Sequence, residues 1–256
     1  PALQFDARAV VVGGQTLRLV PHLGEFDWAA LIFRELPYEA AMYNTLRDSD
    51  ASYDAVLDIG SNVGLFSLFA ASRYPAASIY SFEPEPDALK RLLENLEHNL
   101  SLASRVSVLG VAVTDRGGVA SFHAPRGHLT NGSLDRRFAE RFNACTVVRK
   151  IGTIAAAEVA SLLKTPGRNL IKIDAEGAEP AILRAMQQIA EQFDVEFLIE
   201  VLPDYDREID SIEWIGRLGF NRYVMNGEWQ RADTLVADSG HRDWLLSRRI
   251  LASAPP

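Results

Sequence analysis

The sequence has little cysteine, no excess of positive charge and no long hydrophobic run. Cys145 is the only cysteine in 256 residues, which excludes an intrachain disulfide and a zinc site built from several cysteines. The net charge of −8 disfavours binding to nucleic acid or to anionic lipid surfaces. A membrane span needs about 20 consecutive apolar residues, and none is found. We therefore expect a soluble, cytoplasmic protein without a nucleic-acid or membrane partner, and the oligomeric state stays open.

Hydrophobic periodicity divides the chain into an N-terminal cap, residues 1–50, and a larger domain, residues 51–256. In the cap, residues 8–20 predict a β-hairpin that turns at Gly13-Gly14, and one or two short helices should follow. Beyond the cap, short apolar runs alternate with amphipathic helices, which predicts a doubly wound α/β fold with a largely parallel sheet. Residues 124–144 break this alternation and are interpreted as an insertion near the carboxyl edge of the sheet.

The larger domain should contain seven strands, the last of them antiparallel and reached through a loop with Asn226-Gly227. The expected strands are residues 55–59, 78–82, 106–113, 170–173, 195–201, 220–225 and a run around 244–250.

Residues 56–64, Val-Leu-Asp-Ile-Gly-Ser-Asn-Val-Gly, are typical of a strand that breaks into a cofactor-binding glycine turn, where glycine lets the backbone approach a ligand. The dinucleotide fingerprint would need glycine at Asp58 and glycine or alanine at Val63. Asp58 would also repel a pyrophosphate, whereas S-adenosylmethionine has no phosphate and carries a cationic sulfur. The turn therefore favours S-adenosylmethionine over NAD, and the expected cofactor-binding residues here are Asp58, Gly60, Ser61, Asn62 and Gly64.

A carboxylate that binds the ribose hydroxyls is expected at the end of the second strand, roughly 20 residues beyond the turn. Glu83 lies 19 residues after Gly64, and Pro84 fixes the backbone behind it. We assign both residues to the cofactor site. The alternative is a solvated glutamate at the start of the helix that opens with Pro86.

The fourth strand ends in Lys172-Ile173-Asp174-Ala175-Glu176-Gly177-Ala178-Glu179, which places three carboxylates at the catalytic edge. Asp174 and Glu176 could position the cofactor or substrate, act as a general base or bind a metal; without a second acidic cluster we expect no metal. Glu179 could simply complement the helix dipole. Glu200, at the end of the fifth strand, is either paired with a cation such as Lys172 or functional.

Two loop histidines, His128 and His241, could border the cleft, and His128 is a candidate general base beside Asp174, Glu176 and Glu200. A loop histidine is more often a surface residue. The Gly-x-Ser-x-Gly turn of α/β-hydrolases is absent, so hydrolase chemistry has no support.

Taken together, these motifs resemble the FkbM family of S-adenosylmethionine-dependent methyltransferases over residues 53–248. The resemblance rests on residues 56–64, Ser81-Phe82-Glu83-Pro84-Glu85-Pro86, Asn95, Asn99, Asn131-Gly132-Ser133, and Lys172 to Glu179 followed by Leu183. One departure is Ile151-Gly152-Thr153, where the family usually has Leu-Asp. The resemblance implies a class I, Rossmann-like methyltransferase fold with strand order 3-2-1-4-5-7-6, and O-methylation of sugars, polyketides or related natural products.

The resulting hypothesis is an O-methyltransferase that acts on a hydroxyl group of a small-molecule acceptor. The alternatives are methylation of an amine or carboxyl group, or a binding protein that keeps the methyltransferase fold without turnover.

Overall fold

The computed structural model describes residues 5–22, 25–126, 131–143 and 146–251. Within these residues no helix has the length and apolar character needed to cross a membrane. The strands are β1 (Arg8–Val12), β2 (Gln15–Leu19), β3 (Ala55–Ile59), β4 (Ser78–Phe82), β5 (Val106–Leu109), β6 (Ala112–Thr114), β7 (Gly118–Pro125), β8 (Thr146–Ala155), β9 (Arg168–Ile173), β10 (Asp194–Glu200), β11 (Asn221–Asn226), β12 (Glu228–Ala232) and β13 (Asp243–Ser247).

Helices lie between successive parallel strands of the chain from β3 to β10. The α-helices are α1 (Ala40–Asp48), α2 (Leu65–Arg73), α3 (Pro86–Glu97), α4 (Leu100–Ala103), α5 (Arg136–Glu140), α6 (Glu179–Ala185), α7 (Gln187–Gln192), α8 (Asp206–Asp210) and α9 (Glu213–Arg217). The 3-10 helices are η1 (Phe26–Leu31) and η2 (Ala156–Leu162).

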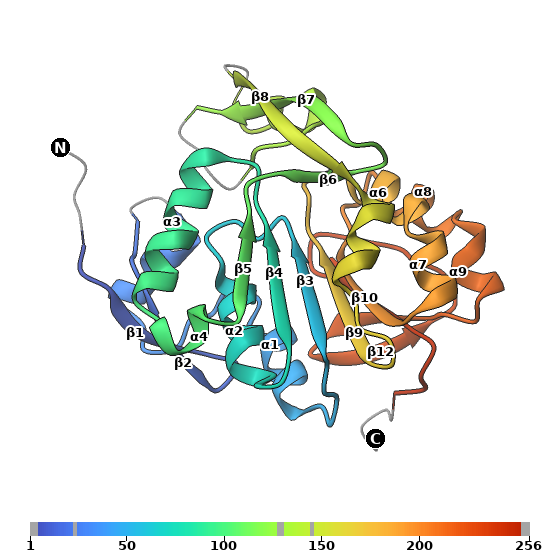
Figure 1. The fold of residues 1–256 in the computed structure, drawn as a ribbon, viewed down its shortest axis with the longest axis horizontal. Helices are drawn as coiled ribbons and strands as arrows, with labels where there is room; N and C mark the ends of the chain where they lie inside the picture. The colour runs from blue at the N-terminus through green and yellow to red at the C-terminus, as the bar shows by residue number, and fades with distance from the viewer. Residues whose placement is uncertain (1–4, 23–24, 127–130, 144–145, 252–256) are drawn as a thin grey trace.

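The main sheet of the described chain has eight strands in the order β12-β11-β13-β10-β9-β3-β4-β5 (Figure 1). The strands from β10 to β5 are parallel, and β13, β11 and β12 pair antiparallel. The predicted α/β class I fold is confirmed, since the expected strands follow one another in the order 3-2-1-4-5-7-6. The predicted count of seven is wrong, because β12 adds a strand at the edge.

The extra strand results from a tight turn at Asn226-Gly227, which the sequence prediction placed in a longer loop. Asn226 pairs with Glu228 across this turn, and Gly227 has a φ of +74°. Asn-Gly is a strong hairpin signal. However, β12 reads Glu-Trp-Gln-Arg-Ala and is largely exposed, so it lacks the apolar alternation by which strands are detected.

The predicted third strand, residues 106–113, is also corrected. It divides at Gly110 into β5, in the main sheet, and β6, in a separate sheet of order β6-β8-β7. The irregular segment 124–144 starts with the last two residues of β7, contains α5 and precedes β8 in the chain. Figure 1 shows the second sheet over the carboxyl ends of β4 and β5.

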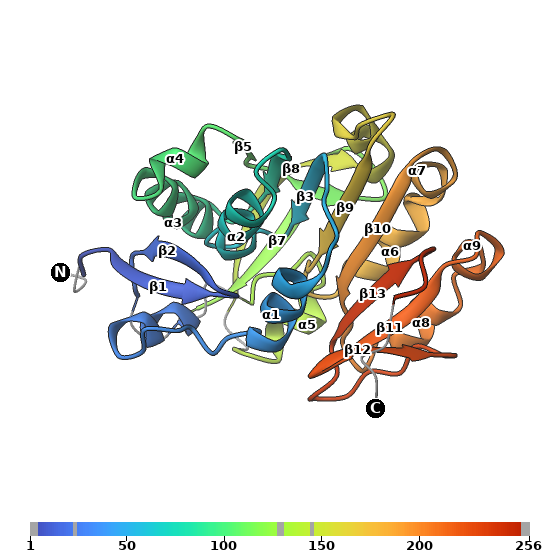
Figure 2. The ribbon, with the colours of Figure 1, turned by 90° about the horizontal axis from the view of Figure 1, so that it is seen from below.

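Side chains of the main sheet alternate between two hydrophobic cores. On β3, Val56 belongs to the first core, whereas Leu57 and Ile59 belong to the second. Residues of the β1–β2 hairpin, α1, α2 and α3 complete the first core, and residues of η2, α6, α7, α8 and α9 complete the second (Figure 2). Helical layers on both faces explain why the central strands are nearly continuous apolar runs.

The N-terminal hairpin, in which β1 and β2 pair antiparallel as expected, contacts Asn95 of α3 and Asn99, which follows that helix. Asn95 also joins the hairpin to the glycine turn. Asn95 accepts a hydrogen bond from the Val20 amide (2.9 Å) and donates one to the Val63 carbonyl (2.9 Å). Asn99 accepts from the amide of Arg18 (3.0 Å) and donates to its carbonyl (2.7 Å). The two asparagines therefore replace the backbone partners that the free edge of the hairpin lacks.

Candidate active site

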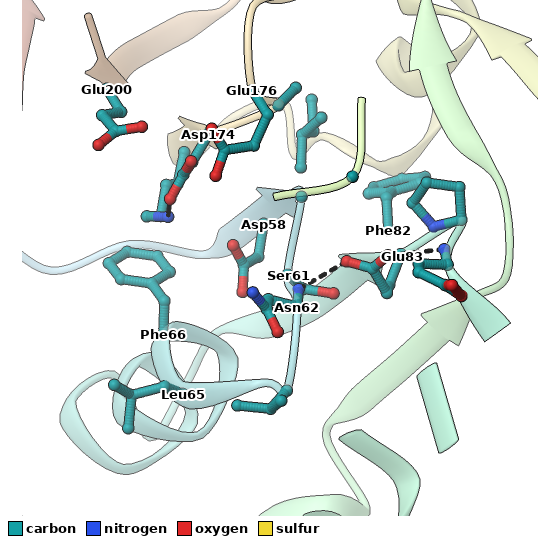
Figure 3. A pocket seen from close by; sticks show the side chains of 18 of the residues that line it. Asp58, Ser61, Asn62, Leu65, Phe66, Phe82, Glu83, Asp174, Glu176 and Glu200 are labelled. Carbon is teal, nitrogen blue, oxygen red and sulfur yellow. Dashed lines mark hydrogen bonds and ion pairs between the residues drawn. The ribbon is translucent and has the colours of Figure 1, made fainter. Parts of the chain in front are cut away.

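A cavity of about 300 Å³ opens at the carboxyl ends of β3, β4, β9 and β10. In the view of Figure 3, Glu83 lies toward one end of the cavity and Glu200 toward the other, with Asp58 and Asp174 between them. Phe122 of the second sheet also lines the cavity. This is the position at which ligands bind in open α/β sheets.

The glycine turn after β3 is required by packing, in addition to any ligand. Gly60 has a φ of +81°, and a Cβ there would lie 1.8 Å from the backbone oxygen of Asp174. Gly64 has a φ of +82°, and a Cβ there would lie 2.9 Å from Cγ of Leu92. Asn62, between them, also has a left-handed backbone, with a φ of +49°. Gly60 thus allows the chain after β3 to touch the chain after β9.

Glu83 is 6% exposed and is held by backbone amides. Its Oε2 accepts a hydrogen bond from the Asn62 amide and its Oε1 one from the Glu85 amide, both at 2.7 Å (Figure 3). Burial raises the pKa of Glu83 to about 8. Pro84 lines the cavity next to it. Each carboxylate oxygen keeps a second lone pair for a ligand hydroxyl.

Within the described chain, three buried polar atoms at the turn have no hydrogen-bond partner: Oδ1 of Asp58, Oγ of Ser61 and Oδ1 of Asn62. All three residues line the cavity. Asp58 is fully buried, and its other oxygen accepts a hydrogen bond from Ser67 Oγ (2.6 Å). Leaving such atoms unpaired is costly. The arrangement therefore fits a ligand that brings hydrogen-bond donors, such as an ammonium group.

The end of β9 carries a buried ion pair. Lys172 is 7% exposed, and its Nζ donates a hydrogen bond to Oδ2 of Asp174 at 2.7 Å. Although burial lowers the pKa of this lysine, the negative charges of Asp174, Glu39 and Asp58 outweigh it and raise the pKa above its ordinary value. Lys172 is therefore a fixed positive charge at the centre of the site.

Two further acids lie beside this pair. Burial, reinforced by the charges of Asp174 and Glu200, holds the pKa of Glu176 well above its ordinary value. Burial raises the pKa of Glu200 to about 9, with Asp174 adding to the shift. Glu200 pairs with Arg242 at 3.2 Å, and not with Lys172. One oxygen each of Asp174, Glu176 and Glu200 lie within 4.8 Å of one another, a spacing that could hold a cation; the absence of metal stays a prediction.

Glu179 is fully buried and orders the loop that carries these acids. Its carboxylate accepts hydrogen bonds from the amides of Ala175 (2.7 Å) and Gly177 (2.9 Å). Ser133 of the Asn-Gly-Ser motif donates to the carbonyl of Glu176 (2.6 Å). Glu179 thus fixes the backbone of the loop between β9 and α6 in addition to being the first residue of α6. Ser133 connects this loop to the segment after β7.

The candidate histidines contribute no ligand-facing group among the residues that the structure describes. His128 lies outside them. His241 pairs with Asp238 through Nδ1 at 3.0 Å, and it is not among the residues that line the cavity.

Several residues line the cavity that the sequence does not mark as site residues, among them Phe26, Tyr38, Glu39 and Arg242. None of these four stands in a motif with a chemical meaning. A left-handed backbone at Glu39, with a φ of +50°, is visible only in three dimensions. The long sequence separation of these residues from β9 explains why no local pattern indicates them.

Comparison with known proteins agrees with this geometry. Residues 58–223 match the family model described as Methyltransferase FkbM domain. The chain is 27% identical over 175 residues to the hexuronic acid methyltransferase AglP of Haloferax volcanii, which covers 68% of this chain and 66% of AglP. It is 28% identical over 182 residues to the 31-O-demethyl-FK506 methyltransferase FkbM of Streptomyces tacrolimicus. This match covers 56% of this chain and 66% of the Streptomyces enzyme.

A solved structure, methyltransferase FkbM from Methylobacillus flagellatus KT, matches with a TM-score of 0.48 at 16% identity. The match covers 77% of this chain and 44% of the Methylobacillus chain. The chain spans less than two thirds of the length of AglP and of the Streptomyces enzyme. The family model nevertheless matches well over half of the 256 residues, and the resemblance drawn from the sequence is confirmed. The chain belongs to the FkbM methyltransferase family.

Proposed function

We propose that the protein is an S-adenosylmethionine-dependent methyltransferase that acts on a hydroxyl group of a sugar, polyketide or other small natural product. The observation that carries this proposal is the set of unpartnered polar atoms at the glycine turn, on Asp58, Ser61 and Asn62. They share a cavity with Glu83 and with the carboxylates at the ends of β9 and β10.

The donor side of the cavity fits S-adenosylmethionine, which supplies a methyl group already activated by a positively charged sulfur. The free oxygen of Asp58 would accept from its ammonium group, which restores the hydrogen bond that this buried atom lacks. Burial raises the pKa of Glu83 to about 8 in the protein without ligand, but hydrogen bonds from the ribose hydroxyls would favour its ionised form. Glu83 would accept these bonds with the lone pairs that the amides of Asn62 and Glu85 leave free. The loop glycines keep side chains out of the turn.

On the acceptor side, Asp174 would take the proton of the attacking hydroxyl. The Lys172 ammonium at 2.7 Å stabilises negative charge on this carboxylate. Glu176 and Glu200, whose pKa values burial raises, would stay protonated at neutral pH and orient the acceptor oxygen. Most of the rate would come from alignment and exclusion of water.

Two relatives are named for small-molecule acceptors, and one of the names places the methyl group on oxygen. Their names give a hexuronic acid for AglP and 31-O-demethyl-FK506 for the Streptomyces enzyme. Both compounds differ widely in size and charge, so the acceptor of this chain has to be found from its own cavity.

Calorimetry tests the proposal. Adenosylhomocysteine should bind in the micromolar range, roughly 8 kcal/mol, and NAD should give no heat of binding. Glu83→Ala should weaken adenosylhomocysteine by about tenfold to a hundredfold, because charge-assisted hydrogen bonds contribute about 1.5 to 3 kcal/mol. Glu97→Ala, an exposed glutamate of the same region, is the control and should leave the affinity unchanged. Tighter binding of NAD than of adenosylhomocysteine would refute the proposal.

A further inference from the structure

One wall of the cavity comes from parts of the chain that the family match does not include. The match covers residues 58–223, whereas Phe26, Tyr38 and Glu39 precede it and Arg242 follows it. All four line the same cavity as the glycine turn. A wall built outside the shared domain is the place where the acceptor of this particular chain would be selected.

The apolar part of this wall is a stacked pair of aromatic rings. Phe26 and Tyr38 lie 4.4 Å apart between ring centroids, with 25° between their planes. Phe26 begins η1, whose next residue, Asp27, forms a buried ion pair with Arg91 of α3. Tyr38 keeps 40% of its surface exposed. The pair therefore offers a rigid, partly exposed flat surface at the cavity.

The polar part is Glu39, which directly follows Tyr38 and precedes α1. Glu39 lines the cavity together with Lys172 and Asp174. Burial raises the pKa of its carboxyl group to about 8, while the positive charge of Lys172 lowers it and the charges of Asp243 and Asp174 raise it further. The Tyr38 hydroxyl shares a hydrogen bond with the neighbouring Glu39. Tyr38 therefore stays a hydrogen-bond donor with an apolar ring face.

The charges of the cavity restrict what can lie on this surface. Among the described lining residues the cations are Lys172 and Arg242, and both are paired, Lys172 with Asp174 and Arg242 with Glu200. A carboxylate or phosphate on the acceptor would find no cation without a carboxyl partner among these residues, and it would have to displace Asp174 or Glu200 to contact one. It would also lie beside the ionised Asp174, which disfavours an anion.

We propose that the acceptor is an uncharged, polyhydroxylated ring of the sugar type, selected by Tyr38 and Glu39. One face of the ring packs on Tyr38, and its hydroxyls bind Glu39 and the Tyr38 hydroxyl. This places another hydroxyl toward Asp174. The inference rests on the proposed methyl transfer and narrows its substrate class.

The test is an array of immobilised glucosides, galactosides and mannosides, each printed beside its uronic-acid counterpart, in the presence of adenosylhomocysteine. The wild-type protein should be retained on at least one neutral glycoside at least about tenfold more strongly than on the matching uronide. Tyr38→Ala and Glu39→Asn should each lower this retention by about tenfold, a loss of roughly 1.4 kcal/mol. Asparagine is chosen because it tolerates the left-handed backbone at Glu39.

Trp28→Ala is the matched control. Trp28 lies in the same segment, has the same exposed fraction of 40% as Tyr38 and does not line the cavity, so its removal should leave retention unchanged. Adenosylhomocysteine affinity should stay within about twofold in all three variants, which separates acceptor binding from misfolding. Preference for uronides, absence of retention on every neutral glycoside, or unchanged retention in both site variants would each overturn the inference. Loss of adenosylhomocysteine binding in the wild type would instead refute the proposed function on which it rests.

Discussion

The donor side and the acceptor side of the cavity are held together by different kinds of contact. On the donor side, Glu83 accepts from two backbone amides and Gly60 lies against the backbone oxygen of Asp174. On the acceptor side, Glu179 also holds the loop after β9 through backbone amides. The lining groups themselves, however, are held by side-chain pairs: Lys172–Asp174, Arg242–Glu200 and Phe26–Tyr38. A backbone amide or carbonyl keeps its contact whatever side chain its residue carries, so the geometry of the donor side is little altered by substitution. Side-chain pairs are lost on substitution, so the acceptor side can differ between enzymes with different acceptors.

The largest effect that this comparison predicts is that of Gly60→Ala. The new Cβ would lie 1.8 Å from the oxygen of Asp174 at a φ of +81°, so strain and overpacking should together cost roughly 2 to 6 kcal/mol of the free energy of unfolding. Adenosylhomocysteine binding should be lost as well, because the turn has to shift. Thermal or urea denaturation and calorimetry measure the two effects.

Gly216→Ala is the control for this substitution. Gly216 lies in α9, and no heavy atom would lie within 4 Å of its new Cβ. Alanine should stabilise this helix by about 0.5 to 1 kcal/mol and leave ligand binding intact. A Gly60→Ala variant as stable as the Gly216→Ala variant would show that the donor side is not fixed by backbone contact.

The donor side and the acceptor side also differ in how much of each the sequence could predict. The glycine turn and Glu83 were predictable, because each stands at a fixed spacing from a buried strand. The pairing of Glu200 with Arg242 was not, because the two residues are brought together only when β13 pairs antiparallel with β10. For the same reason, Tyr38 has no local signal that relates it to β9.

In the fold, the central strands were predictable from their apolar runs, which burial on both faces produces. The end of the third strand was not. Residues 106–113 are apolar apart from Ser107 and Gly110, yet the chain leaves the main sheet after Leu109 and continues into the second sheet at Ala112. Hydrophobicity indicates that a residue is buried, but it does not indicate in which of two sheets.

Taken per group and per pH unit, a smaller effect is expected from the dependence of stability on pH, which acts on both sides of the cavity. Burial raises the pKa of Glu39 to about 8, of Glu83 to about 8 and of Glu200 to about 9, from 4.5. The folded state therefore binds more protons than the unfolded state, and stability should fall as the pH rises from about 5 to about 9. Each such group contributes at most about 1.4 kcal/mol per pH unit.

Denaturation at several pH values measures this slope in the protein without ligand. Glu200→Gln should make the fall shallower, because one of the titrating groups on the acceptor side is removed. Glu97→Gln, at an exposed position, should leave the slope as it is. Stability that rises between pH 5 and pH 9 would mean that these glutamates are ionised in the folded protein, and the protonated role proposed for Glu200 would fall with it.

The smallest expected effect is that of a divalent cation on the acceptor side. Asp174, Glu176 and Glu200 are close enough to bind one, but Lys172 already lies 2.7 Å from Asp174 and Arg242 lies 3.2 Å from Glu200. Burial keeps the pKa of Glu176 well above its ordinary value, so this third carboxyl would have to lose a proton before it could bind a metal. The two side-chain cations therefore compete with a metal for its ligands.

Titration with magnesium or manganese chloride should accordingly give no heat of binding below about millimolar concentration, and methyl transfer to a retained glycoside should be unchanged in excess EDTA. Lys172→Met sharpens the test, because it removes the cation beside Asp174 and should make a weak metal site measurable. Loss of turnover in EDTA with recovery on added magnesium would reverse the assignment. The three carboxylates would then be ligands of a metal that lowers the pKa of the acceptor hydroxyl. The acceptor side would in that case be held by a metal ion and not by side-chain pairs alone.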